Sequence, residues 1–187
     1  MNLDHLEKCA QRQHKGTMAI VEKMVGLPQS QIKMCPIIVK KGTELCMYSP
    51  YPADCEYISP YIMNGGFSLE LKMKYLHYLE TGKQIESGHK LRAIYCELTD
   101  ASKKALRENL KEVVKNCSLC KEAVKFFNSE YKIQFNWDIH KLLSNSNMAF
   151  ERWRYIYEGK NDPTWFAGYS EIQASVDIRI NNLKNGE

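Results

Sequence analysis

The chain has 187 residues, of which 44% are hydrophobic and 26% charged, and its formal net charge is +4. This balance excludes disordered, collagen-like and low-complexity proteins. The length predicts one domain over residues 1–187 that buries roughly 70% of its unfolded surface without needing disulfides. Apolar runs fall short of the ~20 residues that span a membrane, and the charged start lacks a signal-peptide pattern, so we expect a cytoplasmic protein.

The basic surplus lies between residues 100 and 160, which permits contact with a phosphate polymer without requiring it. Seven cysteines are scattered along the chain, and we expect them to be reduced. Cys117 and Cys120 form a Cys-x-x-Cys pattern, but the second ligand pair of a structural zinc site is absent from the sequence. The pattern therefore indicates two small, half-buried helix residues, with metal or redox chemistry as the alternative. We expect no metal and no cofactor.

The first predicted element is a helix over residues 3–25, ended by Gly26. Residues 36–49 then change character. Two β-rich runs flank Lys41 and Gly42, which predicts a short β-hairpin inserted into a helical chain.

A second long helix is predicted over residues 59–79, because apolar residues recur there at helical spacing. Ser59 is a suitable cap, and Pro60 suits the first helical position. Gly65 and Gly66 each cost up to ~1 kcal/mol in a helix interior. We therefore expect another backbone to approach the helix at this point.

The second half of the chain predicts further helices joined by loops. Thr99 or Asp100 caps one of them, Asn136 the longest, and Ser170 the last. Their expected ranges are about 91–98, 100–116, 118–131, 136–158 and 168–185. The fold class that follows is all-α, an up-and-down helical bundle with a β-hairpin insertion near residues 36–49.

Two distant segments match motifs of one helical family. The first is a Ser/Ala-x-Glu-x-x-x-Lys-x-Leu helix followed by a His-x-Leu-x-x-Leu segment, and the second, Ala149–Glu158, is similar to a F-x-x-W-R-Y-x-Y-E helix. With them, residues 58–159 resemble the HEPN domain, a superfamily of prokaryotic helical bundles common in toxin–antitoxin and phage-defence systems. The positions matched by the first motif are Ser68, Glu70, Lys74, Leu76, His89, Leu91 and Ile94.

The resemblance implies a homodimer and, in catalytic members, a metal-independent ribonuclease with an Arg-x4-6-His signature in the dimer cleft. None of the five histidines has an arginine at the required spacing. We therefore expect a HEPN-like binding module without that site, whose partner is RNA, a nucleotide, or a protein such as a cognate antitoxin or defence protein. The alternatives are a divergent metal-independent endoribonuclease and a purely structural dimerisation module.

The candidate site residues come from the two matched segments. Glu70 and Lys74 have the i, i+4 spacing of a helix ion pair. His89 is a candidate for proton transfer or phosphate contact, because the unperturbed pKa of a histidine, near ~6.5, suits proton transfer. For each, a structural role is the alternative. The catalytic candidates are His89, Arg154 and Glu70. The binding candidates are Glu70, Lys74, His89, Arg152, Arg154, Tyr157 and Glu158.

A basic ridge is predicted on the helix over residues 100–116. It would give a salt-sensitive, sequence-independent contact with a phosphate backbone, and a solvated helix face is the alternative. Its members, at every fourth position, are Lys103, Arg107, Lys111 and Lys115.

Overall fold

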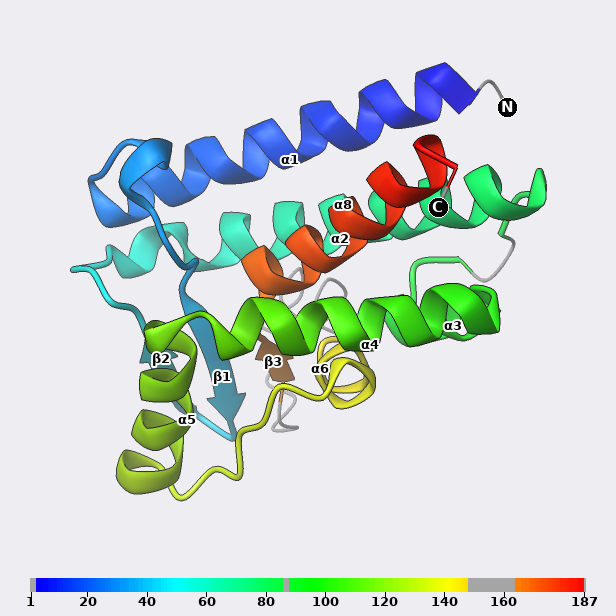
Figure 1. Ribbon diagram of the computed structural model, residues 1–187. Coiled ribbons are helices and arrows are strands. Elements are labelled where there is room, and N and C mark those ends of the chain that lie inside the picture. The colour runs from blue at the N-terminus through cyan, green and yellow to red at the C-terminus, as the bar shows by residue number, and fades with distance from the viewer. Residues whose placement is uncertain (1–2, 86–87, 148–163, 187) are drawn as a thin grey trace.

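The computed structural model describes residues 3–85, 88–147 and 164–186. Helices dominate it, and a small sheet lies at one end of the helical layer (Figure 1). The α-helices are α1 (Leu3–Val25), α2 (Ile58–Thr81), α3 (Leu91–Glu97), α4 (Asp100–Lys115), α5 (Ser118–Glu130), α6 (Ile139–Asn145) and α8 (Tyr169–Lys184). The strands are β1 (Ile37–Lys41), β2 (Glu44–Tyr48) and β3 (Thr164–Phe166), and two short 3-10 helices cover Gln29–Gln31 and Cys55–Tyr57.

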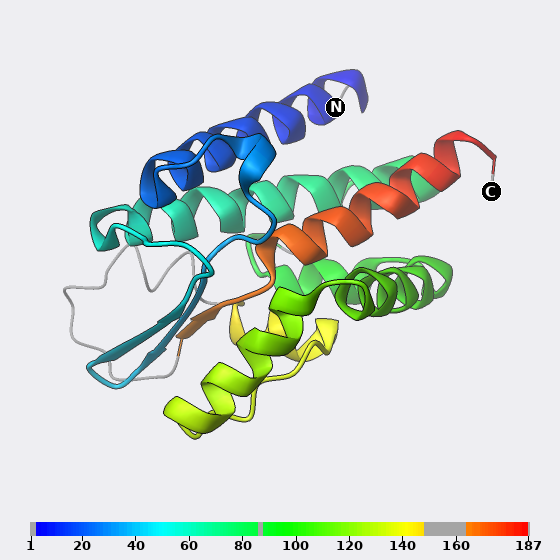
Figure 2. The same ribbon diagram turned by 60° about the vertical axis from the view of Figure 1, so that its left-hand side comes forward.

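Helix α2 is central to the helical layer. It runs antiparallel to α1, while α8 packs on α2 and α4 packs on α8 (Figures 1 and 2). Because α2 has neighbours on several sides, its buried residues extend around the helix instead of forming one stripe. The start of α1 and the end of α8 lie at the same end of the layer. The mainly helical prediction is thereby confirmed.

The sheet is larger than the predicted hairpin. Strands β1 and β2 form that hairpin, with Gly42 at a φ of 61° in the turn. Strand β3 then pairs antiparallel with the other edge of β1, with Ile38 opposite Phe166, which gives the order β2-β1-β3. The all-α class is therefore corrected to a mostly helical fold with a three-stranded antiparallel sheet.

Gly65 lies where α2 meets this sheet. A Cβ atom placed on Gly65 would lie 2.5 Å from the ring of Phe166 in β3. That ring is buried and packs edge-on against Tyr61 at 5.1 Å between centroids. The close approach predicted for this part of α2 is present, but an aromatic side chain makes it instead of a backbone.

The boundaries of three helices differ from the prediction. Helix α2 begins at Ile58, so Ser59 is not its cap, and Pro60 fits because N–H groups of a first turn need no helical partner. The cap of α8 is Gly168, with a left-handed φ of 71°. Ser170 instead accepts a hydrogen bond from the backbone N–H of Cys35 at 3.1 Å.

The helix predicted over residues 136–158 is shorter where the structure describes it, and residues 148–158 of that prediction lie outside the described residues. Asp138 caps α6 by accepting a hydrogen bond from the N–H of Lys141 at 2.8 Å, and the helix ends at Asn145. Ser146 and Asn147 form a turn. Serine and asparagine favour such turns because their side chains compete for backbone hydrogen bonds. Among the residues that the structure describes, the helices are all too short or too polar to cross a membrane.

Candidate functional site

Three of the predicted site residues meet at one carboxylate. Glu70 lies on α2 with only 4% of its surface exposed, and Lys74, one turn later, donates from Nζ to Oε1 of Glu70 at 2.8 Å. The side chain of Lys74 is 21% exposed. A carboxylate this deeply buried needs charged or hydrogen-bonding partners, and Lys74 is the first of them.

His89 supplies the second partner from outside the helix. It follows Gly88, whose φ of 69° turns the chain just before α3. Its Nδ1 lies 3.0 Å from both Oε1 and Oε2 of Glu70. Since a carboxylate accepts hydrogen bonds, this contact places the proton of a neutral imidazole on Nδ1 and makes Nε2 its basic nitrogen. The side chain is 61% exposed, so a fixed imidazole reaches the surface.

We call Glu70, Lys74 and His89 the Glu70 cluster. The other predicted binding residues, Arg152, Arg154, Tyr157 and Glu158, lie outside the described residues. The expected meeting of the glycine-led and tryptophan-bearing segments therefore stays a prediction. Within the described ranges, no group of three or more histidine, cysteine or acidic side chains forms a metal site.

The basic ridge on α4 has local partners at three of its four positions. Lys103 pairs with Asp100 at 3.2 Å, and Lys115 lies 3.8 Å from Glu112. Arg107 Nη1 donates to the hydroxyl of Tyr95 on α3 at 3.4 Å. Lys111 is exposed. Because two of its four cations pair with carboxylates, the ridge is a weaker phosphate-binding candidate than the spacing indicated.

A buried network at the end of α2 has no counterpart in the prediction. Oε1 of Glu80 accepts hydrogen bonds from Thr99 at 2.9 Å, from Ser102 at 2.5 Å and from Arg179 at 3.2 Å. Arg179 Nε also donates to Ser102 at 3.0 Å. The side chains of Glu80 and Arg179 are 6% and 15% exposed. This network ties α2, α4 and α8 together, and contacts between such distant segments leave no local sequence signal.

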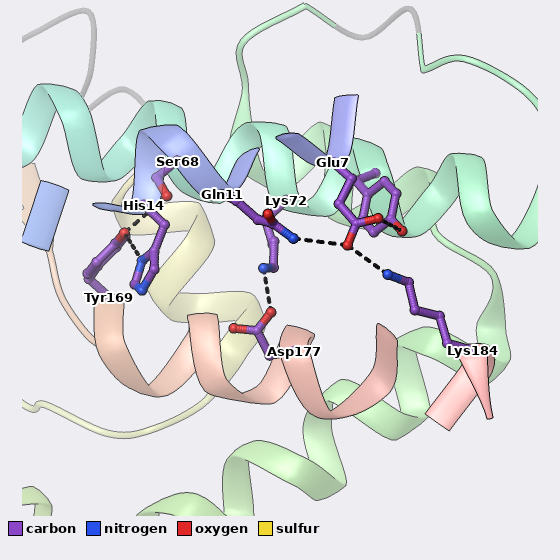
Figure 3. A network of polar contacts seen from close by, with 9 residues as sticks. Glu7, Gln11, His14, Ser68, Lys72, Tyr169, Asp177 and Lys184 are labelled. Carbon is purple, nitrogen blue, oxygen red and sulfur yellow. Dashed lines mark hydrogen bonds and ion pairs between the residues drawn. The ribbon is translucent and has the colours of Figure 1, made fainter. Parts of the chain in front are cut away.

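Polar contacts also line the strip where α1, α2 and α8 meet, as Figure 3 shows. Nδ1 of His14 lies 2.8 Å from the hydroxyl of Tyr169, which donates to Ser68 at 3.0 Å. Burial lowers the pKa of His14, and the positive charge of Lys72 lowers it further, against the opposing effect of Asp177. This keeps the imidazole neutral and suits a packing role.

The other contacts of this strip are ion pairs. Lys72 binds Asp177 at 2.5 Å, and Lys184 binds Glu7 at 2.7 Å (Figure 3). The hydrogen bond from Lys184 lowers the pKa of Glu7 despite its partial burial. Because these charges are paired within the strip, the strip links helices and is a poor site for an ionic ligand.

Two clefts lie near the sheet and share Lys132 and Ile133. The smaller has a volume of about 210 Å³, and Val39, Lys41 and Trp165 complete its lining. The larger, of about 310 Å³, follows the loop between α5 and α6. Neither contains a residue of the Glu70 cluster, so these clefts are separate from it.

A scan against models of protein families finds no match to this chain, and searches of curated proteins and of solved structures find none either. The functional argument therefore rests on the residues themselves and on their geometry.

Proposed function

We propose that this chain is a HEPN-like, homodimeric binding module that contacts RNA or a nucleotide through the Glu70 cluster, in a prokaryotic defence or toxin–antitoxin setting. The observation that carries the proposal is the convergence of Glu70, Lys74 and His89. The three residues match positions of the HEPN-like motif, and their side chains meet through contacts of 2.8 to 3.0 Å.

The chemistry of the cluster favours an anionic ligand. The carboxylate holds an ammonium group and an imidazole in fixed positions. The ammonium carries N–H donors near the surface, and the imidazole carries one on Nε2 in its protonated form. Donors of this kind contact phosphate oxygens without reading base sequence. Fixing them in advance lowers the entropy cost of binding.

Binding is better supported than cleavage. Cleavage of RNA without a metal needs one group that accepts a proton and one that donates it. Glu70 is buried and already accepts from two donors, so within the described residues of the cluster only His89 is placed to exchange a proton with a ligand. One such group suffices for recognition but is incomplete for acid–base catalysis.

The second candidate function is a divergent metal-independent endoribonuclease. The hydrogen bond from His89 to Glu70 favours it, because a carboxylate on Nδ1 orients an imidazole and fixes its tautomer. In that case Arg154 is the proposed second group. A third proposal, a structural dimerisation module, needs neither residue.

Labelled single-stranded RNA separates these proposals. Fluorescence anisotropy in EDTA should show binding that weakens as salt increases, because phosphate contacts release counterions. We expect His89→Ala and Lys74→Met each to weaken binding by roughly 5-fold to 20-fold, which corresponds to ~1–2 kcal/mol. The matched control is His5→Ala, an exposed histidine on α1.

Three results would count against the binding proposal. Equal affinity of the wild type and His89→Ala would place the RNA elsewhere, and no binding at low salt would favour the structural module. Cleavage in EDTA that is lost in His89→Ala and Arg154→Ala would identify the nuclease. Sedimentation equilibrium tests the homodimer in the same samples, and a monomer at micromolar concentration would contradict it.

A further inference from the structure

The Cys-x-x-Cys pattern lies at the start of helix α5. Cys117 is the N-cap residue, and Cys120 lies in the first turn. The two differ in exposure, since Cys117 is partly exposed and Cys120 is 0% exposed. One thiol of the pair is thus reachable from solvent, and the other is buried.

Helix geometry brings these two residues to the spacing of a disulfide. Residues three apart in a helix have Cα atoms about 5 Å apart, from a rise of 1.5 Å and a turn of 100° per residue. Disulfides span Cα distances of roughly 4.4–6.8 Å. The two thiols also interact: burial raises the pKa of Cys120, and the negative charge of Glu171 and the Cys117 thiol raise it further.

Capping does not explain a cysteine at this position. Thr99 and Asp138, the caps of α4 and α6, each accept a hydrogen bond from a backbone N–H of the first turn. Cys117 makes no such bond. Serine there would stabilise the helix by about 1 kcal/mol relative to a non-capping residue. The thiol is therefore present at a cost in helix stability.

We propose that Cys117 and Cys120 form a reversible disulfide by exchange with low-molecular-weight disulfides of the glutathione class. This inference is independent of RNA binding at the Glu70 cluster. It assigns a thiol-exchange site to the corner between α4 and α5, where the N–H of Cys117 binds the carbonyl oxygen of Val114 at 3.2 Å.

The exchange has two balanced steps. The Cys117 thiol loses its proton to solvent, and the thiolate attacks one sulfur of the small disulfide, so that a new S–S bond forms and one small thiolate leaves. Cys120 then loses its proton to that thiolate and attacks the sulfur of Cys117, which releases the second small thiolate. Two protein thiols are oxidised to one disulfide, and one small disulfide is reduced to two thiols.

The remaining cysteines provide an internal comparison. Cys55 and Cys96 are exposed, on a 3-10 helix and on α3, while Cys35 and Cys46 are buried. Exposed thiols without a resolving cysteine stop at the mixed disulfide. Cys55 and Cys96 are therefore expected to retain glutathione where the Cys117–Cys120 pair releases it.

The full-length protein is incubated with glutathione disulfide under native conditions, quenched with acid, alkylated and digested with trypsin. Cleavage after Lys115 and Lys121 releases one peptide, Asn116–Lys121, that carries both cysteines. We expect most of this peptide to be lighter than its unalkylated dithiol form by the mass of two hydrogen atoms. Dithiothreitol should reverse the change.

Cys117→Ser is the matched variant, because serine restores a helix cap and the protein should fold normally. Its Asn116–Lys121 peptide has one cysteine and cannot form the disulfide, while Cys55 and Cys96 should still react. The proposal is overturned if the wild-type peptide stays reduced, or carries glutathione on Cys117, under conditions that modify Cys55 and Cys96. Circular dichroism confirms that each variant is folded.

Discussion

Helix α2 carries two buried glutamates whose surroundings differ. Glu70 is anchored by Lys74 and by His89, whose side chain is 61% exposed. Glu80 is anchored by Thr99, Ser102 and Arg179, and its cation is only 15% exposed. Both carboxylates need partners because burial of an unpaired charge is costly.

The two carboxylates differ in where their hydrogen-bond partners lie. The partners of Glu80 belong to α4 and α8, so that carboxylate joins helices and is closed to solvent. One partner of Glu70 belongs to a turn at the surface. Glu80 thus holds helices together, whereas Glu70 orients the exposed side chain of His89. Substitutions at these residues test whether the two carboxylates have different roles.

The largest expected effect is at the closed carboxylate. Glu80→Ala should lower the free energy of unfolding by about 3–5 kcal/mol, because it leaves the guanidinium of Arg179 buried without its ion pair. Urea unfolding measures the loss. Glu97→Ala, an exposed acid on α3, should change stability by less than about 0.5 kcal/mol. A loss at Glu80 as small as that at Glu97 would contradict a scaffold role.

A third carboxylate, Glu171, is also buried, and among the described residues no cation hydrogen-bonds to it. It accepts from Ser170 at 2.9 Å, while Oε2 has no hydrogen-bond partner in the part of the chain that the structure describes. Burial raises its pKa from 4.5 to about 7. The folded state thus favours the protonated form.

The sign of the pH effect follows from that shift. Protonated Glu171 makes its full contribution to the free energy of unfolding below pH ~4.5. That contribution falls as pH rises toward 7 and is lost above it, with a total of up to about 3 kcal/mol. Urea unfolding at several pH values should show this decline in the wild type. Glu171→Gln should remove it, and equal pH profiles for the two proteins would contradict the prediction.

Gly65 tests the contact that fixes α2 against the sheet. Gly65→Ala should cost about 1–3 kcal/mol, because the added methyl group overlaps the buried ring of Phe166. Gly16→Ala is the control, since nothing lies within 4 Å of a Cβ there, and it should stabilise α1 by up to ~1 kcal/mol. Thermal unfolding compares them, and shifts of the same sign would show that the contact with Phe166 is unimportant.

The smallest stability effect is expected at the exposed end of the Glu70 cluster. His89→Ala should change the free energy of unfolding by less than about 1 kcal/mol, because a largely exposed contact is screened by solvent. Its effect on RNA binding should exceed its effect on stability. A stability loss comparable to that of Glu80→Ala would make His89 a scaffold residue.

Local patterns predicted the elements well. The apolar spacing of α1 and α2, the hairpin around Gly42 and the Thr99 cap of α4 all appear in the structure. The contact between Glu70 and Lys74 also follows from their i, i+4 spacing. These features depend on residues close in sequence, where periodicity and capping carry information.

Features made by distant residues were not predictable in the same way. Strand β3 has three residues, too few for a periodic pattern, and it exists because β1 offers a free edge. The ion pair of Glu80 and Arg179 joins helices far apart in the chain. The family motif placed Glu70 and His89 in one set, while their hydrogen bond depends on the turn at Gly88.

The position of β1 between its two neighbours has a consequence for synthesis on the ribosome. Strand β2 is available as soon as the hairpin has emerged, but β3 follows only after helices α2 to α6. Until then one edge of β1 lacks its partner, and such an edge invites pairing with other chains. The sheet therefore closes only after residues 164–166 have emerged, and the high sequence separation of this pairing predicts slow late folding.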